Sequence, residues 1–195
     1  MLLRADSLAA THAIAAALAS LSRPGDIIVL AGEMGAGKTA FAQGFGRALG
    51  ITDAITSPTF TLVHSYPCPD GRRTLHHADI YRLDRTSDVE ELALHELAEF
   101  GGIVLIEWGD VAAAALGDHL VVRLSFDDEL DDDDMDDRDT QGDEPHGDEP
   151  GIGLVDQLAD DFGLDSTRTI ELHAAGSSWA GRWDRLQSDL TAYRW

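Results

Sequence analysis

The first third of the chain alternates between helical and strand-like spacing of its apolar residues. Near the N-terminus an alanine-rich stretch resembles the core of a signal peptide, but its apolar residues recur at helical spacing and predict an amphipathic helix. The predicted apolar face consists of Ala10, Ile14, Leu18 and Leu21. Residues 27–31 form a short, continuous apolar run, IIVLA, which is typical of a buried parallel strand. Residues 39–49 return to helical spacing, and Gly50 marks the end of that helix.

Two pairs of alternating runs predict strands that lie side by side. In the first pair, residues 57–67 and 72–83 flank the turn sequence PCPDG, which predicts a hairpin. In the second pair, residues 118–126 and 166–176 alternate in the same way. Because a hairpin is antiparallel and the buried run at 27–31 is typical of a parallel strand, we expect a mixed sheet.

Between these pairs lie a predicted helix and a second buried strand. Residues 87–100 have helical spacing, with Ser87 as the expected N-cap and Glu90 completing a capping box. Residues 101–110 contain an apolar strand that ends at Glu107. The order of elements predicts an α/β sandwich in which helices flank a mixed, mainly parallel central sheet.

A long acidic segment separates the two strands of the second pair. The 195 residues carry a formal net charge of −22, and residues 127–150 contribute −13 of it through eleven Asp, three Glu and one Arg. With almost no apolar side chains, this segment cannot offset the entropy cost of ordering. We expect a disordered insertion within a single domain that spans residues 1–195. A metal site built from the aspartates is the less common alternative.

Composition also limits the compartment and the partners. The single cysteine, Cys68, cannot form an internal disulfide, and no apolar stretch approaches the length of a membrane span. We therefore expect a cytoplasmic protein with no membrane partner. The 171 residues outside the acidic segment carry −9, which would repel a phosphate backbone, so tight binding to RNA is not expected.

The octet GEMGAGKT, residues 32–39, lies between the first buried strand and the helix that follows it. Its spacing is that of a P-loop, in which backbone N–H groups surround phosphates, the lysine reaches the β- and γ-phosphates, and the threonine hydroxyl binds Mg²⁺. The strand, loop and helix context favours this interpretation over a plain glycine-rich turn. The sequence therefore predicts a P-loop NTPase-like fold that binds ATP and Mg²⁺. The residues expected to contact the nucleotide are Glu33, Met34, Gly35, Ala36, Gly37, Lys38 and Thr39.

Two carboxylates are candidates for metal binding and catalysis. Glu107 follows four apolar residues at the carboxyl end of a strand, where α/β sheets bind ligands, and it stands where P-loop proteins usually carry Asp. We expect it to hold Mg²⁺, directly or through water, or to polarise the attacking water. Asp79 closes an alternating strand and is either a second site carboxylate or only a cap or a partner of Arg82. His76 and His77 are interpreted as bystanders, because neighbours on a strand point to opposite faces and cannot chelate one metal together.

Four motifs, in this order, resemble the bacterial TsaE family (formerly YjeE): GEMGAGKT, SPTFTLVHSY, HADIYRL and LIEWGD. The resemblance covers residues 5 to about 125 and resumes near residue 167. It implies a small Mg²⁺-dependent ATPase required to form the threonylcarbamoyl group on adenosine 37 of tRNAs that read codons beginning with A. It also implies action with the TsaB–TsaD complex, in which TsaD transfers the group. We expect the ATPase to be slow alone and stimulated by these partners, without tight tRNA binding of its own.

The resemblance assigns roles to individual residues. The catalytic residues that it implies are Lys38, Asp79 and Glu107, and the Mg²⁺ ligands are Thr39 and Glu107. It places Thr11 and Trp108 beside the nucleotide. Residues 57–61 resemble a switch-like loop of the family. Because residues 127 to about 165 stand where the family has a short turn, a contact between Arg168 and the nucleotide is left open.

Two other functions are compatible with the P-loop and the two carboxylates when the family resemblance is set aside. In a small-molecule kinase of the P-loop class, the HADIYRL motif would position an acceptor hydroxyl. Such a kinase needs a lid, typically arginine-bearing, and no arginine-rich loop follows the second strand motif. The third possibility is a nucleotide-gated binding module that barely turns over.

Replacing residues 127–150 with a short Gly/Ser linker is expected to leave folding and basal ATP hydrolysis unchanged. The segment has no core to join, and each doubling of loop length costs only about 0.6 kcal/mol. The melting temperature and the ATPase rate of the replacement, measured beside the intact chain, check this expectation. A melting temperature lowered by many degrees, or loss of hydrolysis, would show that the aspartates belong to the folded structure.

Overall fold

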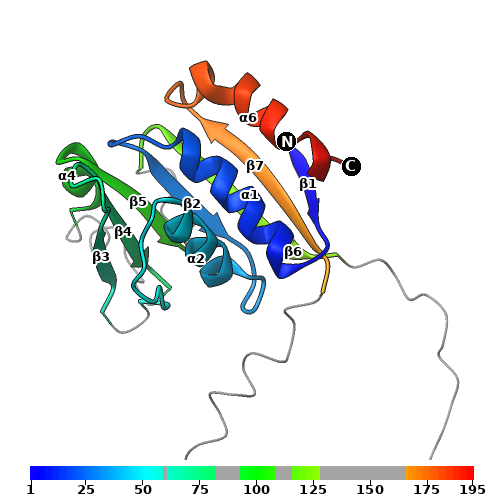
Figure 1. Cartoon of the computed structure of the whole chain (residues 1–195), viewed down its shortest axis with the longest axis horizontal. Helices are drawn as coiled ribbons and strands as arrows, with labels where there is room; N and C mark the ends of the chain where they lie inside the picture. Colours follow the sequence, from blue (N-terminus) through cyan, green and yellow to red (C-terminus); the bar gives the residue numbers. More distant parts are fainter. Residues whose placement is uncertain (59–60, 82–92, 109–115, 128–165) are drawn as a thin grey trace, which may run out of the picture.

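The computed structural model describes residues 1–58, 61–81, 93–108, 116–127 and 166–195. Its strands are β1 (Leu2–Ala5), β2 (Ile27–Ala31), β3 (Val63–Pro67), β4 (Thr74–Asp79), β5 (Gly102–Glu107), β6 (His119–Phe126) and β7 (Arg168–Ala175). Its helices are α1 (Leu8–Leu21), α2 (Lys38–Ala48), α4 (Leu94–Glu99), α6 (Trp183–Asp189) and the short 3-10 helices η3 (Ala180–Arg182) and η4 (Thr191–Tyr193). All the strands join one sheet of order β1-β7-β6-β2-β5-β4-β3 (Figure 1).

The middle of the sheet is parallel and its margins are antiparallel. Strand β2 pairs in parallel with both β5 and β6, and β4 pairs in parallel with β5. Antiparallel pairs follow on either side, β3 with β4, and β7 with β6 and β1. The predicted mixed sheet in an α/β fold is therefore confirmed, as are both predicted strand pairs. The carboxyl ends of β2, β4 and β5 consequently lie along one edge.

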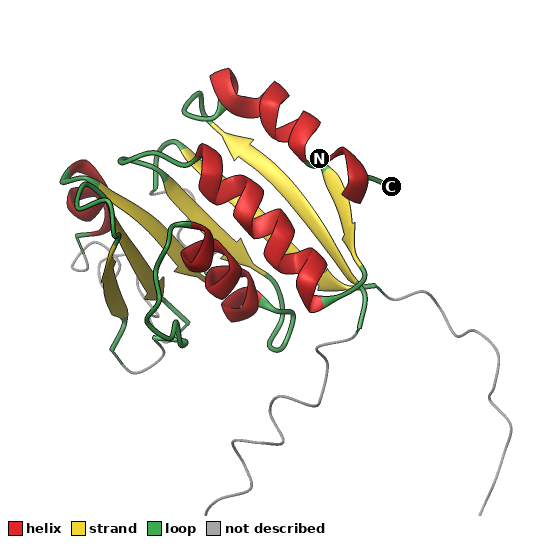
Figure 2. Cartoon of the chain, viewed as in Figure 1, coloured by secondary structure: helices red, strands yellow, loops and turns green. Residues whose placement is uncertain are grey.

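Each face of the sheet has its own apolar core, because successive residues of a strand point to opposite faces. On one face, Ile28 and Leu105 pack with residues of α1, α2 and α6; on the other, Val29 and Ile106 pack with α4. Figure 2 shows α1, α2 and α6 lying side by side over the sheet. The predicted apolar face of the N-terminal helix is buried in the first of these cores. Among the described residues, no helix has the length and the apolar character needed to cross a membrane.

Two predicted boundaries were wrong, and one strand was missed. The helix predicted for residues 87–100 is not continuous, because Ala93 has a left-handed backbone (φ 50°) and α4 begins only after it. Ser87 and Glu90 lie outside the described residues. The strand predicted from residue 57 begins at Val63, after Leu62 at φ 64°. Strand β1, which had not been predicted, pairs with β7 from a distant part of the sequence.

The described structure includes Asp127, the first residue of the predicted acidic insertion. The backbone N–H of Asp127 donates to the carbonyl of Thr167 at 3.1 Å, and the Asp127 carboxylate lies 3.3 Å from Nε of Arg4. Asp127 therefore continues the hydrogen-bond ladder between β6 and β7. Its backbone partner follows from the pairing of these strands, although its side chain belongs to the acidic segment of the sequence. The rest of the predicted insertion lies outside the described residues.

A buried ion pair ties the C-terminal segment to the start of β2. The Arg182 guanidinium donates to both carboxylate oxygens of Asp26, at 2.5 and 2.8 Å, and also to the backbone carbonyls of Leu21 and Ser178. It stacks on the ring of Trp179 with 4.1 Å to the centroid. Both charged side chains are nearly fully buried, so each depends on the other for its charge to be compensated.

We expect Arg182→Met to lower the free energy of unfolding by about 3–5 kcal/mol, because it leaves the Asp26 charge buried without its partner. Arg185→Met is the matched control, since the Arg185 side chain is 74% exposed and its ion pair with Asp189 is long, at 3.8 Å. Urea denaturation of both variants checks the prediction. Equal stabilities of the two variants would contradict it.

Candidate functional site

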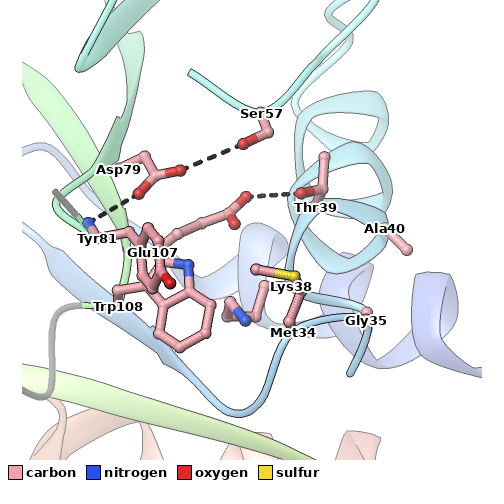
Figure 3. Close-up of a pocket in the computed structure, with 11 residues that line it drawn as sticks. Met34, Gly35, Lys38, Thr39, Ala40, Ser57, Asp79, Tyr81, Glu107 and Trp108 are labelled. Atoms are coloured by element: carbon pink, nitrogen blue, oxygen red, sulfur yellow. Dashed lines mark hydrogen bonds between the residues drawn. The ribbon is translucent and has the colours of Figure 1, made fainter. Parts of the chain in front are cut away.

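A cavity of about 370 Å³ opens where β2, β4 and β5 end and α2 begins. Its lining residues come from four stretches of chain that are far apart in the sequence (Figure 3). They are Met34, Gly35, Gly37, Lys38, Thr39, Ala40, Ser57, Asp79, Tyr81, Glu107 and Trp108. The cavity thus lies at the carboxyl edge of the parallel strands, the position at which open α/β sheets bind ligands.

The P-loop, residues 32–39, needs glycine at two points for different reasons. Gly32 has a φ of 136°, and a Cβ atom there would lie 2.1 Å from the backbone oxygen of Leu124. Gly37 has a φ of 101° and is the N-cap of α2, which lacks a side-chain cap. The loop can therefore turn tightly from β2 into α2, whose N-terminal N–H groups and positive dipole end favour a bound anion.

Lys38 lies within the loop, with its charge compensated by backbone oxygens. Its Nζ atom donates to the carbonyls of Gly32 and Glu33, at 2.8 and 2.7 Å, and lies 3.7 Å from the centroid of the Trp108 ring. Lys38 as a whole is only 5% exposed. A cation held by neutral carbonyls and an aromatic face, beside a cavity, is positioned to meet an anionic ligand.

Glu107 connects α2 to β4. Its Oε1 atom accepts a hydrogen bond from the Thr39 hydroxyl at 2.9 Å and another from Nε2 of His77, also at 2.9 Å. Both predicted Mg²⁺ ligands, Thr39 and Glu107, are therefore in direct contact. The structure also shows that the interpretation of His77 as a bystander was wrong, because its ring contacts a predicted site carboxylate.

Asp79 both caps its strand and lines the cavity. Its Oδ1 atom accepts from the backbone N–H of Tyr81 at 2.9 Å, and its Oδ2 atom accepts from the Ser57 hydroxyl at 3.3 Å. Figure 3 shows these bonds beside the bond between Glu107 and Thr39. The two interpretations of Asp79, as a site residue and as a cap, are thus both compatible with its position, whereas Arg82 lies outside the described residues.

Trp108 follows Glu107 with a left-handed backbone, φ 62°, that a bulky residue rarely adopts. Its backbone N–H donates to the carbonyl of Leu30 at 3.0 Å, and its ring packs on Tyr81 with 4.8 Å between centroids. The turn at this residue directs the indole across Lys38. Backbone strain of this kind persists where the surrounding contacts fix it, and it is common at functional sites.

Four other residues singled out from the sequence do not line the cavity. Glu33 and Ala36 contribute backbone carbonyls, the first to Lys38 and the second to Nε of Arg168 at 3.2 Å. The Arg168 guanidinium also stacks on a phenylalanine ring, and burial lowers its pKa from the ordinary value. Thr11 is buried on α1, where its hydroxyl donates to the carbonyl of Ser7 at 3.3 Å. The expected nucleotide contact of Thr11 stays a prediction.

Comparison with known proteins identifies the family. The family model for "Threonylcarbamoyl adenosine biosynthesis protein TsaE" matches residues 5–137, more than half of the chain. The chain belongs to the TsaE family. This family match includes the P-loop, Asp79 and Glu107, and it confirms the resemblance that the four motifs indicate.

Two relatives and one solved structure illustrate the similarity. The tRNA threonylcarbamoyladenosine biosynthesis protein TsaE of Bacillus subtilis (strain 168) is 40% identical over 122 residues, which cover 61% of this chain and 75% of that protein. The protein of the same name from Treponema pallidum (strain Nichols) is 42% identical over 101 residues, 52% of this chain and 73% of its own length. The crystal structure of Bacillus subtilis YdiB superposes with a TM-score of 0.62 at 27% identity, covering 98% of this chain and 94% of that one. The P-loop NTPase-like fold expected from the sequence is thus confirmed for this TsaE-family chain.

Proposed function

We propose that this chain is a Mg²⁺-dependent P-loop ATPase that acts with TsaB and TsaD in forming threonylcarbamoyladenosine at position 37 of tRNA. Family membership supports the pathway, because the relatives are named for the biosynthesis of that nucleoside. One observation carries the chemistry: the hydrogen bond of 2.9 Å between Thr39, at the start of α2, and Glu107, at the end of β5. It joins the P-loop to the carboxylate strand beside an open cavity.

Phosphate binding would use the P-loop and Lys38. The N-terminus of α2 offers backbone donors and a positive dipole end to the phosphates. Lys38 would exchange the carbonyls of Gly32 and Glu33 for phosphate oxygens, which are better partners for a buried cation because they carry charge. Trp108 would then keep water away from one side of the ammonium group.

The residues present fit a magnesium ion. Thr39 and Glu107 offer a hydroxyl and a carboxylate, the oxygen donors that Mg²⁺ prefers, and they already contact each other. Within the described part of the chain, no group of three or more His, Cys, Asp or Glu is arranged to hold a metal by itself. Phosphate oxygens and water would therefore complete the coordination, as is usual for Mg²⁺ at nucleotide sites. When bound, the ion would neutralise charge on the β- and γ-phosphates.

Asp79 is the candidate to orient the attacking water. The Tyr81 N–H and the Ser57 hydroxyl hold its carboxylate at the cavity wall, next to Glu107 on the neighbouring strand. A carboxylate fixed in this way can accept a proton from water and align it toward a phosphate. Because Ser57 belongs to the loop between α2 and β3, movement of that loop would remove the Ser57 donor from the Asp79 carboxylate.

Exposed apolar side chains around the cavity support a protein partner. Met34 is 72% exposed and Tyr81 53% exposed, and both line the cavity. Apolar groups gathered at a site entrance commonly mark a surface that another protein covers. We propose that TsaB and TsaD supply that cover in the cytoplasm and stimulate hydrolysis.

Phosphate release measured with and without TsaB and TsaD tests this proposal. A rate of phosphate release that rises only with the partners supports it, whereas fast transfer of phosphate to a metabolite supports a kinase.

We expect Lys38→Ala to lower ATP hydrolysis by roughly 10²–10³-fold while the fold persists, because it removes a charge directed at the phosphates. Steady-state phosphate release and circular dichroism give the two readouts. Arg185→Ala removes a positive charge from the exposed face of α6 and serves as the control. A folded Lys38→Ala protein with normal hydrolysis would remove the P-loop from the proposed site.

Glu107→Gln is expected to weaken the Mg²⁺ dependence and abolish most hydrolysis, with nucleotide binding partly retained through the backbone of the P-loop. The substitution keeps the shape of the side chain but removes the charge that the metal needs. Hydrolysis titrated against Mg²⁺ is the measurement, with Glu99→Gln at the exposed end of α4 as the control. Hydrolysis by the Glu107→Gln protein that equals the control would show that Glu107 only caps its strand.

A further inference from the structure

His77 and Glu107 lie on the same face of the sheet. In the parallel register of β4 and β5, His77 pairs with Leu105 and Asp79 pairs with Glu107. Alternation along each strand therefore directs all these side chains toward the face covered by α1 and α2, where Leu75 and Leu105 belong to the core. His77 is fully buried there, at 0% exposure.

The imidazole of His77 has one polar contact within the described part of the chain. Its Nε2 atom lies 2.9 Å from Oε1 of Glu107, and its Nδ1 atom is buried with no hydrogen-bond partner among the residues that the structure describes. Because a carboxylate only accepts hydrogen bonds, Nε2 carries a proton and is the donor to Glu107. Burying the polar imidazole ring costs free energy, and an apolar residue of the same shape would avoid that cost. The contact with Glu107 is the one feature of His77 that such a residue could not supply.

We propose that His77 is a positioning residue that holds the Glu107 carboxylate in the orientation needed for Mg²⁺, an inference that rests on the proposed function. Oε1 of Glu107 has two donors, Thr39 and His77, which fix the rotation of the carboxylate. In the proposed site the Thr39 hydroxyl would bind the metal through an oxygen lone pair and keep its O–H for Oε1, so His77 is the donor to Oε1 that does not itself touch the metal. Oε2, which has no hydrogen bond to a described residue, then serves the metal or its water.

His77 does not act as a ligand or a catalyst itself. It is absent from the residues that line the cavity, and its Nε2 atom is occupied by Glu107. Its neighbour His76 points to the opposite face, where Nδ1 pairs with the Ser65 hydroxyl at 2.8 Å. The chain thus contains an adjacent histidine, also buried, that shares the strand but not the contact with Glu107.

The test compares His77→Leu, His77→Gln and His77→Asn with the control His76→Gln in the full chain. The amide nitrogen of Gln can occupy the place of Nε2, whereas that of Asn can occupy only the place of Nδ1. The readout is the Mg²⁺ concentration that gives the half-maximal change in binding of a fluorescent ADP, with melting temperature as the folding check. Outer-sphere partners of this kind typically change metal affinity by about 10–100-fold.

We expect His77→Leu and His77→Asn to raise that Mg²⁺ midpoint by about 10–100-fold, and His77→Gln and His76→Gln to keep it near wild type. ADP binding without Mg²⁺ should be unchanged in all four. In a Glu107→Gln background, His77→Leu should cause no further shift. Equal midpoints for the Gln and Asn variants of His77 would overturn the proposal, and they decide the matter even if the Leu variant fails to fold.

Nitrogen NMR of the ring in the nucleotide-free chain gives an independent readout. We expect the tautomer with the proton on Nε2, and a proton on Nδ1 alone would overturn the proposal. Failure of the proposed function looks different, because the wild-type chain itself would then show no Mg²⁺-dependent ADP binding. Wild-type binding that depends on Mg²⁺, together with an unshifted His77→Leu variant, would refute only the role of His77.

Discussion

One oxygen atom, Oε1 of Glu107, joins the three elements from which the site is built. It belongs to β5, accepts from Thr39 at the start of α2, and accepts from His77 on β4. The two hydrogen bonds that meet at this atom link α2 and β4 to β5. The contact is possible because β2, β4 and β5 are parallel, so that their carboxyl ends and the loop after β2 meet along one edge.

The site concentrates features that a stable core avoids. Lys38, Asp79 and Glu107 are each at most 5% exposed, although burying charged groups is costly. Trp108 adds a left-handed backbone immediately after Glu107. The two apolar cores, one on each face of the sheet, stabilise the frame that holds these groups in place. Departures from local preference that gather at one edge of an otherwise regular sheet are typical of sites selected for function.

Local patterns predicted the parts of the site that lie within one stretch of sequence. The P-loop spacing identified Lys38 and Thr39, and the acid after four apolar residues identified Glu107. His77 was missed because the sequence analysis considered it only as a possible metal-chelating partner of His76. Alternation along the strand places it on the same face as Asp79. Its contact with Glu107 also depends on the register between β4 and β5, which no local pattern contains. Strand β1 was missed for the same reason, since its partner β7 lies at the other end of the chain, and the left-handed Ala93 has no signal in residue type.

A crystal structure of the chain with Mg²⁺ and a non-hydrolysable ATP analogue would decide whether the cavity at the end of the parallel strands is the nucleotide site. We expect the β- and γ-phosphates within the P-loop, with Nζ of Lys38 moved from the carbonyls of Gly32 and Glu33 onto the phosphates. We also expect Mg²⁺ beside Thr39 and Glu107. A nucleotide bound elsewhere, or bound here while Lys38 keeps both carbonyl contacts, would contradict this assignment.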